Sequence, residues 1–126
     1  MKKDLDQFAF LASPYSTGDA LLREHRFRLA CRAVAWLWQY YGLPVYSPIS
    51  HSHAIAMHSF LDPLDPFWYV AALTMLRHAS ELWVLLLDGW QGSKGVQGEF
   101  CEAVALKLPI HYIRYEKGEF REVEKP

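Results

Sequence analysis

The sequence has few cysteines, no long hydrophobic run and no excess of positive charge. Its two cysteines, Cys31 and Cys101, lie in apolar segments with helical spacing, where a thiol behaves as a small hydrophobic side chain. Neither a disulfide framework nor a zinc site is therefore predicted. The longest apolar run covers residues 82–87, far short of the ~20 residues of a membrane-spanning helix. With a formal net charge of -1, the chain offers no basic surface for nucleic acid. We expect neither a membrane nor a nucleic acid as a partner.

What the chain does contain is enough apolar sequence for one core. It has 126 residues, of which 52% are hydrophobic and 21% are charged, a composition typical of globular proteins. Two separate cores would each be too small to be stable without disulfides or metals, so a single domain over residues 1–126 is predicted. The first residues, "MKKDLDQ", lead into no apolar signal region, and the expected compartment is the cytoplasm.

Extended and helical patterns alternate along the chain. Short apolar runs bounded by turn formers predict strands, whereas apolar residues at helical spacing predict helices. Asp19 is a candidate N-cap for the first helix, and Gly42 is its stop signal. The predicted strands cover residues 8–12, 44–49, 81–88 and 109–115, and the predicted helices cover residues 19–41, 67–78 and 96–107. This alternation is the signature of a three-layer α/β domain with a parallel sheet, and a turn at Gly118 leads into a possible antiparallel edge strand.

Polar residues collect in the loops that follow the first three predicted strands. In open parallel sheets, ligands bind outside the carboxyl ends of the strands, near helix N-termini. The loops read "ASPYST", "SPISHSH" and "DGWQGSKG". The side chains expected to share this rim are Ser13, Tyr15, Ser16, His51, His53, Asp88, Ser93 and Glu99.

Glu99 falls on the flank of the apolar arc of its predicted helix, facing neither fully inward nor fully outward. Its neighbour Gly98 lowers helix stability by ~0.5 to 1 kcal/mol relative to alanine, which suggests that something approaches the backbone closely there. A bound ligand would make such a close approach. The alternative is that Glu99 complements the helix dipole, while Gly95 and Gly98 accommodate packing against the sheet.

Three segments in order, "FAFLASPYS", "VYSPISHSH" and "LLLDGWQGSKGVQGEFCEAVALKLPIHYI", resemble a bacterial family of uncharacterised proteins similar to nucleoside 2-deoxyribosyltransferases. That superfamily includes 2'-deoxynucleoside 5'-monophosphate N-glycosidases. The resemblance covers nearly the whole chain. It implies a flavodoxin-like sandwich with strand order 2-1-3-4, and oligomeric assembly.

The resemblance also implies roles for individual residues. Glu99 would be the nucleophile that attacks the anomeric carbon of the sugar. Ser93, with Gly95, would contact the 5'-phosphate or the 5' end of the sugar. The first loop would supply Tyr15 to orient the nucleophile, and Ser13, Pro14 and Ser16 to hold the sugar or phosphate.

This sequence differs from the family pattern at the acid that protonates the leaving base. Relatives carry an aspartate on the helix before the third strand, where this sequence has Ala71 and Ala72. Asp62, Asp65, Asp88 or a loop histidine could substitute, and Asp88 is the best placed, at the carboxyl end of its strand. Its alternative role is to form the turn before Gly89.

Further candidates are weaker. His51 and His53, two apart on a predicted extended segment, would point the same way and could ligate a metal with His58, but no carboxylate or thiol completes the set, so no metal and no cofactor are expected. Arg23 and Arg26 could reach a phosphate from the first helix. Aromatic residues make up 15% of the chain, a share that favours a homo-oligomer of two or more copies.

The leading hypothesis is cleavage of an N-glycosidic bond, or deoxyribosyl transfer, on a nucleoside or nucleoside monophosphate. A module that binds a nucleotide or nucleotide sugar without turnover is the first alternative. The second is an interaction protein in which the polar rim no longer binds a ligand.

Overall fold

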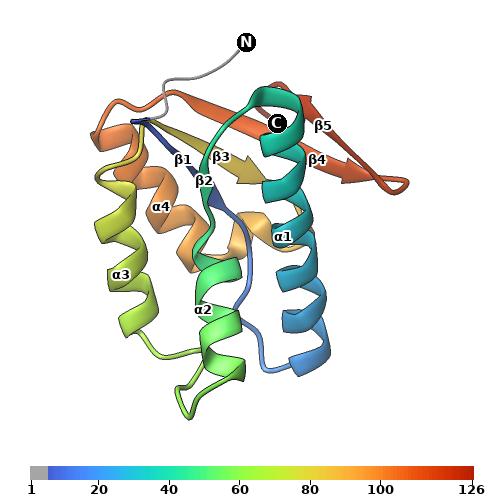
Figure 1. Cartoon of the computed structure of the whole chain (residues 1–126), viewed down its shortest axis with the longest axis vertical. Helices are drawn as coiled ribbons and strands as arrows, with labels where there is room; N and C mark the ends of the chain where they lie inside the picture. Colours follow the sequence, from blue (N-terminus) through green and yellow to red (C-terminus); the bar gives the residue numbers. More distant parts are fainter. Residues whose placement is uncertain (1–5) are drawn as a thin grey trace.

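The protein folds into a five-stranded sheet with helices on both faces, as seen in a computed structural model that describes residues 6–126 (Figure 1). The strands are β1 (Ala9–Ala12), β2 (Val45–Tyr46), β3 (Glu81–Leu85), β4 (Ile110–Glu116) and β5 (Glu119–Val123). Their order in the sheet is β2-β1-β3-β4-β5; the first four are parallel and β5 is antiparallel to β4. The predicted flavodoxin-like sandwich, its strand order and its antiparallel edge strand are confirmed.

The contiguous apolar runs of the strands fill two cores, one on each side of the sheet. Alternate residues of β1 face opposite ways: Leu11 packs with α1 (Ala20–Tyr41), whereas Phe10 packs with α3 (Phe67–Leu76) and α4 (Lys94–Ala105). Because both faces are covered, β1 and β3 have no polar face, which explains why their hydrophobic residues are contiguous. Within residues 6–126, no helix is both long enough and apolar enough to cross a membrane.

The long helix α1 has the two ends that the sequence predicts. The Asp19 carboxylate accepts hydrogen bonds from the backbone N–H groups of Leu21 and Leu22, at 3.0 and 3.3 Å, as an N-cap does. Gly42 ends the helix in the left-handed conformation, with φ of 63°. The N-terminal end of α1, capped by Asp19, lies at the carboxyl edge of β1 (Figure 1).

The second predicted strand is wrong beyond Tyr46. β2 contains only Val45–Tyr46, and helix α2 (Pro48–Met57) replaces the extended segment expected there. The reason is local: the Ser47 hydroxyl accepts a hydrogen bond from the Ser50 N–H at 3.2 Å, and Pro48 stands at the first helical position, where its missing N–H is not needed. The pair Ser47–Pro48 thus starts a helix rather than continuing a strand.

The turn after β3 also differs from the prediction. β3 ends at Leu85 instead of residue 88, because the Leu87 N–H bonds the Leu85 carbonyl and Gly89, with φ of 90°, redirects the chain. One 3₁₀ turn, η1 (Trp90–Gly92), follows. Helix α4 then begins at Lys94, two residues before the prediction, since Ser93 caps it through a 3.2 Å bond from the Val96 N–H.

Candidate functional site

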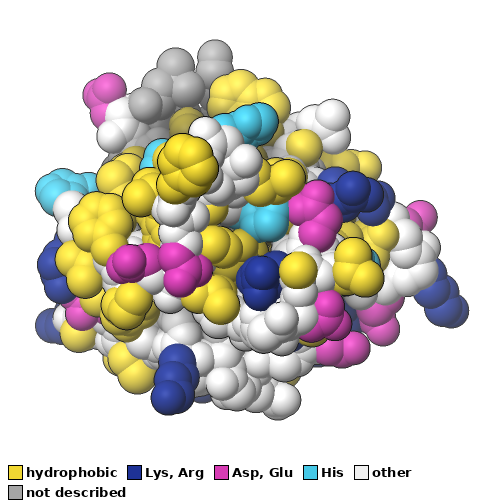
Figure 2. Space-filling model, turned by 90° about the horizontal axis from the view of Figure 1, so that it is seen from below, with side chains coloured by type: hydrophobic (Ala, Val, Ile, Leu, Met, Phe, Trp, Pro, Cys, Tyr) yellow, Lys and Arg dark blue, Asp and Glu magenta, His cyan; other side chains and the backbone are white. Residues whose placement is uncertain are grey.

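A cavity of about 760 Å³ opens at the carboxyl edge of the sheet, within the range of roughly 300–1,000 Å³ typical of small-molecule sites. Figure 2 looks onto this end of the molecule, where hydrophobic side chains are bordered by acidic, basic and histidine side chains. Its walls come from the loop after β1, the start of α2, the segment 63–66, α3 and the start of α4. The site therefore lies where the topology of a parallel sheet places ligands.

Glu99 lies in the second turn of α4 and lines this cavity with only 5% of its surface exposed. No hydrogen bond or ion pair joins its carboxyl to any other residue of the described chain. Burial raises the pKa of Glu99 from 4.5 to about 8. Glu99 lies in the second turn of its helix, and desolvation is the cause of this shift. At neutral pH Glu99 is mainly protonated.

Two tyrosines that the sequence did not single out lie near Glu99. Burial raises the pKa of both Tyr46 and Tyr69, and the Glu99 charge raises each further. The hydroxyl of Tyr69 packs on Gly98, where a Cβ atom would overlap it. The close approach inferred at Gly98 is therefore made by Tyr69 of α3, not by a ligand. Gly95, in contrast, has only Ser93 Oγ near the position of a Cβ atom, at 3.9 Å, and borders the cavity.

Ser13 supplies a second polar group without a partner. Its hydroxyl oxygen is fully buried and has no hydrogen-bond partner among residues 6–126. Ser13 is 5% exposed and lines the same cavity as Glu99. A buried hydroxyl without a partner destabilises a protein by about 1–3 kcal/mol, so this atom is available to a bound polar ligand.

The predicted site residues divide into two groups. Those that the structure brings to the cavity are Ser13, Tyr15, Ser16, Ser93, Gly95 and Glu99. Those that do not line it are Pro14, Arg23, His51, His53 and Asp88. The loops after β1 and η1 thus account for the successes, whereas the failures come mainly from the unpredicted helix α2 and the early end of β3.

Asp88 does not converge with the other candidates. Its side chain is exposed, and its backbone carbonyl accepts a 3.1 Å bond from the Arg26 guanidinium. Arg26 also bonds the Tyr15 carbonyl at 3.3 Å and lies over Gly89, so it ties two loops together. In addition to Glu99, Asp65 contributes a carboxyl group to the cavity lining. Its Oδ1 accepts a hydrogen bond from the Phe67 N–H at 2.8 Å, at the start of α3.

The two histidines of "HSH" point in different directions because they lie on a helix. His51 is exposed and its ring lies 5.8 Å from that of Tyr46. His53 is buried and stacks on Phe27 of α1 at 4.2 Å. No group of three or more possible metal ligands occurs in the described part of the chain.

Arg23 reaches the first loop without lining the cavity. Its guanidinium donates to the Thr17 carbonyl at 2.6 Å. Burial raises the pKa of Tyr15, and the Arg23 charge opposes this shift. Pro14 is fully buried in the same loop and does not line the cavity.

Several lining residues had no assigned role in the sequence interpretation. They come from α2, the loop before α3, α3 itself and the start of α4: Pro48, Ile49, Ser52, Pro63, Leu64, Pro66, Trp68, Tyr69, Gly92 and Lys94. The Ser-Pro pair before α2 is the one local signal that could have placed the first three. Those of the loop before α3 and of α3 are distant in sequence from Glu99, and only the packing of α3 brings them to it, whereas Gly92 and Lys94 lie just before Glu99 in the chain.

Comparison with protein families matches residues 7–114 to the family described as "Domain of unknown function (DUF1937)". The chain belongs to this family. The matched part of the DUF1937 domain contains every residue that lines the cavity and leaves out β5. A search of curated proteins finds no match to the chain. The family description names no activity, so the function has to be argued from the cavity.

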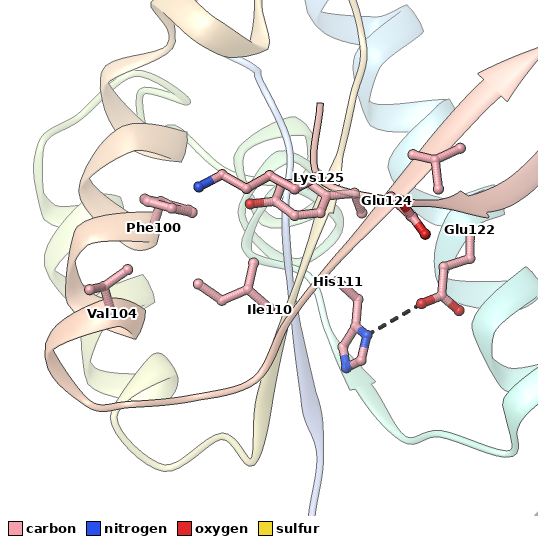
Figure 3. Close-up of a pocket in the computed structure, with 9 residues that line it drawn as sticks. Phe100, Val104, Ile110, His111, Glu122, Glu124 and Lys125 are labelled. Carbon is pink, nitrogen blue, oxygen red and sulfur yellow. Dashed lines mark ion pairs between the residues drawn. The ribbon is translucent and has the colours of Figure 1, made fainter.

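A second depression of the DUF1937 domain, of about 710 Å³, lies between α4, β4 and the C-terminal residues (Figure 3). His111 contacts Glu122 there at 3.4 Å, and Lys125 extends across toward Phe100. Ile110, at the amino end of β4, forms part of its wall, and residues 122–125 lie beyond the family match. It holds none of the candidate residues, and it borders the edge of the sheet opposite to the one that parallel folds use.

Proposed function

We propose that the cavity binds a nucleoside or nucleoside monophosphate and cleaves its N-glycosidic bond, with Glu99 as the nucleophile. The observation that carries the proposal is the Glu99 carboxyl itself: buried, without a protein partner, and lining a cavity large enough for such a ligand. A buried carboxyl is destabilising unless a ligand or a reaction uses it, and groups of this kind concentrate in active sites.

The lining residues match the three parts of a nucleotide. Trp68 and Tyr69 offer aromatic surface on which a base can stack. The unpartnered Ser13 hydroxyl can bond a sugar hydroxyl. Ser93 and Lys94, at the N-terminus of α4, suit the 5' end of the sugar or its phosphate, because a helix N-terminus and an ammonium group both favour an anion. The reaction requires no cofactor.

In the proposed reaction, the ionised Glu99 carboxylate attacks the anomeric carbon while the base departs with the electron pair of the C–N bond. Water then hydrolyses the glycosyl ester, or a second base accepts the sugar. A pKa of about 8 leaves a usable ionised fraction at neutral pH and half at pH 8. The carboxylate in this desolvated site is also more nucleophilic than one in water.

A screen of nucleosides and their 5'-monophosphates for base release by chromatography tests the proposal. A 2-fluoro-2-deoxy nucleoside should trap the glycosyl ester, visible by intact-mass spectrometry and mapped to Glu99 by peptide analysis. Glu99→Gln should abolish base release and retain binding. Turnover that survives Glu99→Ala would refute the assignment.

The alternative function is binding without turnover, and one observation favours it. Ala72 lines the cavity on α3, so a methyl group occupies the wall where an aspartate would act as the acid in similar enzymes. A thermal-shift screen with the same compounds separates the two functions. Stabilisation by a nucleotide without release of its base would support the binding module.

Assembly as a homo-oligomer in the cytoplasm belongs to the same proposal. Large hydrophobic side chains are exposed on α2, on α3 and on the loop between them, including Met57, Phe60, Leu61, Phe67 and Val70. Exposed apolar surface of this kind is typical of an interface. Sedimentation velocity, with Phe60→Ser as the disrupting variant, tests the oligomer.

A further inference from the structure

Three side chains from three elements form a chain of two short hydrogen bonds beside the cavity. The Tyr15 hydroxyl lies 2.6 Å from His53 Nδ1, and His53 Nε2 lies 2.8 Å from Glu24 Oε2. Tyr15 follows β1, His53 belongs to α2 and Glu24 belongs to α1. We call these three residues the relay.

The relay connects two pockets of the protein. Tyr15 lines the 760 Å³ cavity that holds Glu99, whereas His53 and Glu24 line a separate open pocket of about 300 Å³. The Glu24 side chain is 33% exposed, while His53 is buried. A proton can therefore pass from the open pocket to the cavity along these two hydrogen bonds.

The hydrogens of the relay follow from its acceptors. Glu24 can only accept, so His53 Nε2 carries a hydrogen. His53 Nδ1 then has two states: without a hydrogen it accepts the Tyr15 O–H, and with one it donates to the Tyr15 oxygen. In the second state the Tyr15 O–H is released from His53 and can donate into the cavity.

Two neighbours hold the His53 ring in place. Glu24 faces Nε2 directly, and Phe27 of α1 stacks on the ring. Arg23 and Asp62 act on Tyr15, and Arg28 lies 3.6 Å from the Oε1 atom of Glu24. Glu24 is the charged group in direct contact with the imidazole.

We propose that Tyr15 is the acid that protonates the departing base, and that His53 and Glu24 are positioning residues that resupply its proton from solvent. This inference rests on the proposed function. It assigns a proton donor to a cavity in which Ala72 occupies the wall where similar enzymes carry an aspartate.

The proton transfer is balanced. As the C–N bond breaks, its electron pair stays on the base nitrogen, which takes the Tyr15 proton. The phenolate oxygen takes the proton of His53 Nδ1. His53 is left neutral, with its Nε2–H still donating a hydrogen bond to Glu24, and becomes imidazolium again by taking a proton from solvent. One proton has moved from solvent to the base.

Asp65 is the competing donor, since it also lines the cavity. It is exposed, and its Oδ1 already accepts the Phe67 N–H. The Asp65 carboxyl therefore already accepts a backbone hydrogen bond, which makes it less suited than Tyr15 to deliver a proton. Asp65→Asn is therefore included in the test as a separate variant.

The test compares two leaving groups on one sugar. 2'-Deoxyadenosine needs a proton as its base departs, whereas 4-nitrophenyl 2-deoxy-β-D-ribofuranoside releases a stable phenolate without one. For Tyr15→Phe we expect kcat on deoxyadenosine to fall about 10²–10⁴-fold, with the nitrophenyl substrate changed less than about threefold. KM should change little for either substrate.

Glu24→Gln and His53→Gln should show the same selectivity with smaller losses, and imidazole should partly restore deoxyadenosine cleavage by His53→Ala. Tyr40→Phe, at an exposed tyrosine outside the relay, is the matched control and should leave both rates unchanged. Circular dichroism of each variant checks that it is folded.

Each outcome decides the proposal. Equal losses on both substrates for Tyr15→Phe, or selective loss in Asp65→Asn alone, would overturn the relay while leaving Glu99 as the nucleophile. Failure of the wild-type protein to cleave even the nitrophenyl substrate would overturn the proposed function and the relay with it. Cleavage that survives Glu99→Ala but is selectively lost in Tyr15→Phe would refute only the nucleophile.

Discussion

The Tyr69 hydroxyl lies directly on the backbone of Gly98, one residue before the buried Glu99. This contact couples α3 to α4 beside the cavity, and it makes glycine necessary for the present position of the tyrosine ring. An alanine at this position gains helix propensity, worth up to ~1 kcal/mol, but has to displace the ring.

A double-mutant cycle measures this coupling. Gly98→Ala should leave stability unchanged or lower in the wild-type background, and raise it by ~0.5–1 kcal/mol in a Tyr69→Leu background, as measured by urea unfolding. Gly95→Ala, with no close neighbour at its Cβ position, is the control and should have the same effect in both backgrounds. If the effects of Gly98→Ala and Tyr69→Leu on stability are additive, the contact between the two residues contributes nothing to stability.

The stability of the protein should fall as pH rises because of Glu99. Its pKa of about 8 in the folded state exceeds the ordinary 4.5, so the folded protein keeps a proton that the unfolded chain releases between these values. The resulting loss of folding stability is absent below pH 4.5 and complete above about pH 8. At about 1.4 kcal/mol per pKa unit, this loss is on the order of several kcal/mol.

Glu99→Gln removes this titration. We expect the variant to be more stable than the wild type at pH 9 and equally stable at pH 4, in urea unfolding at each pH. Glu102→Gln, on the same helix but bridged to Arg77 at 3.0 Å, serves as the control and should show no gain at pH 9. An equal effect of Glu99→Gln at both pH values would contradict the raised pKa.

The same pKa predicts the pH dependence of the reaction. The nitrophenyl deoxyriboside needs no acid, so its kcat/KM should report the ionisation of Glu99 in the free enzyme. It should rise about tenfold per pH unit below 8 and level off above it. A rate that decreases through the same range would show that Glu99 acts as an acid and not as the nucleophile.

Ser93 is expected to serve both the helix and the ligand. Ser93→Ala removes the N-cap of α4 and should lower stability by ~1 kcal/mol. Isothermal calorimetry should show a greater loss of affinity for deoxyadenosine 5'-monophosphate, about tenfold, than for deoxyadenosine. Asp19→Ala, which removes the cap of α1 instead, should lower stability by a similar amount without changing the ratio of the two affinities. Equal losses for both ligands with Ser93→Ala would leave this residue only its capping role.

The sequence alone determined the architecture of this protein, because the signals for it are local. The contiguous apolar run of β3, the Asp19 cap and the Gly42 stop each act over a few residues, and their alternation restricts the chain to a parallel sheet covered on both faces. Position at the carboxyl edge was enough to bring Ser13, Tyr15 and Glu99 to one cavity.

Tertiary structure decided the chemistry of the site. The spacing of His51 and His53 gave no sign of the helix that separates them, and no local pattern places Tyr69 on Gly98 or joins His53 to both Tyr15 and Glu24. The protonation of Glu99 likewise depends on how much water the packed helices exclude. Burial and long-range contacts set these properties, and both arise only when segments distant in the sequence pack together.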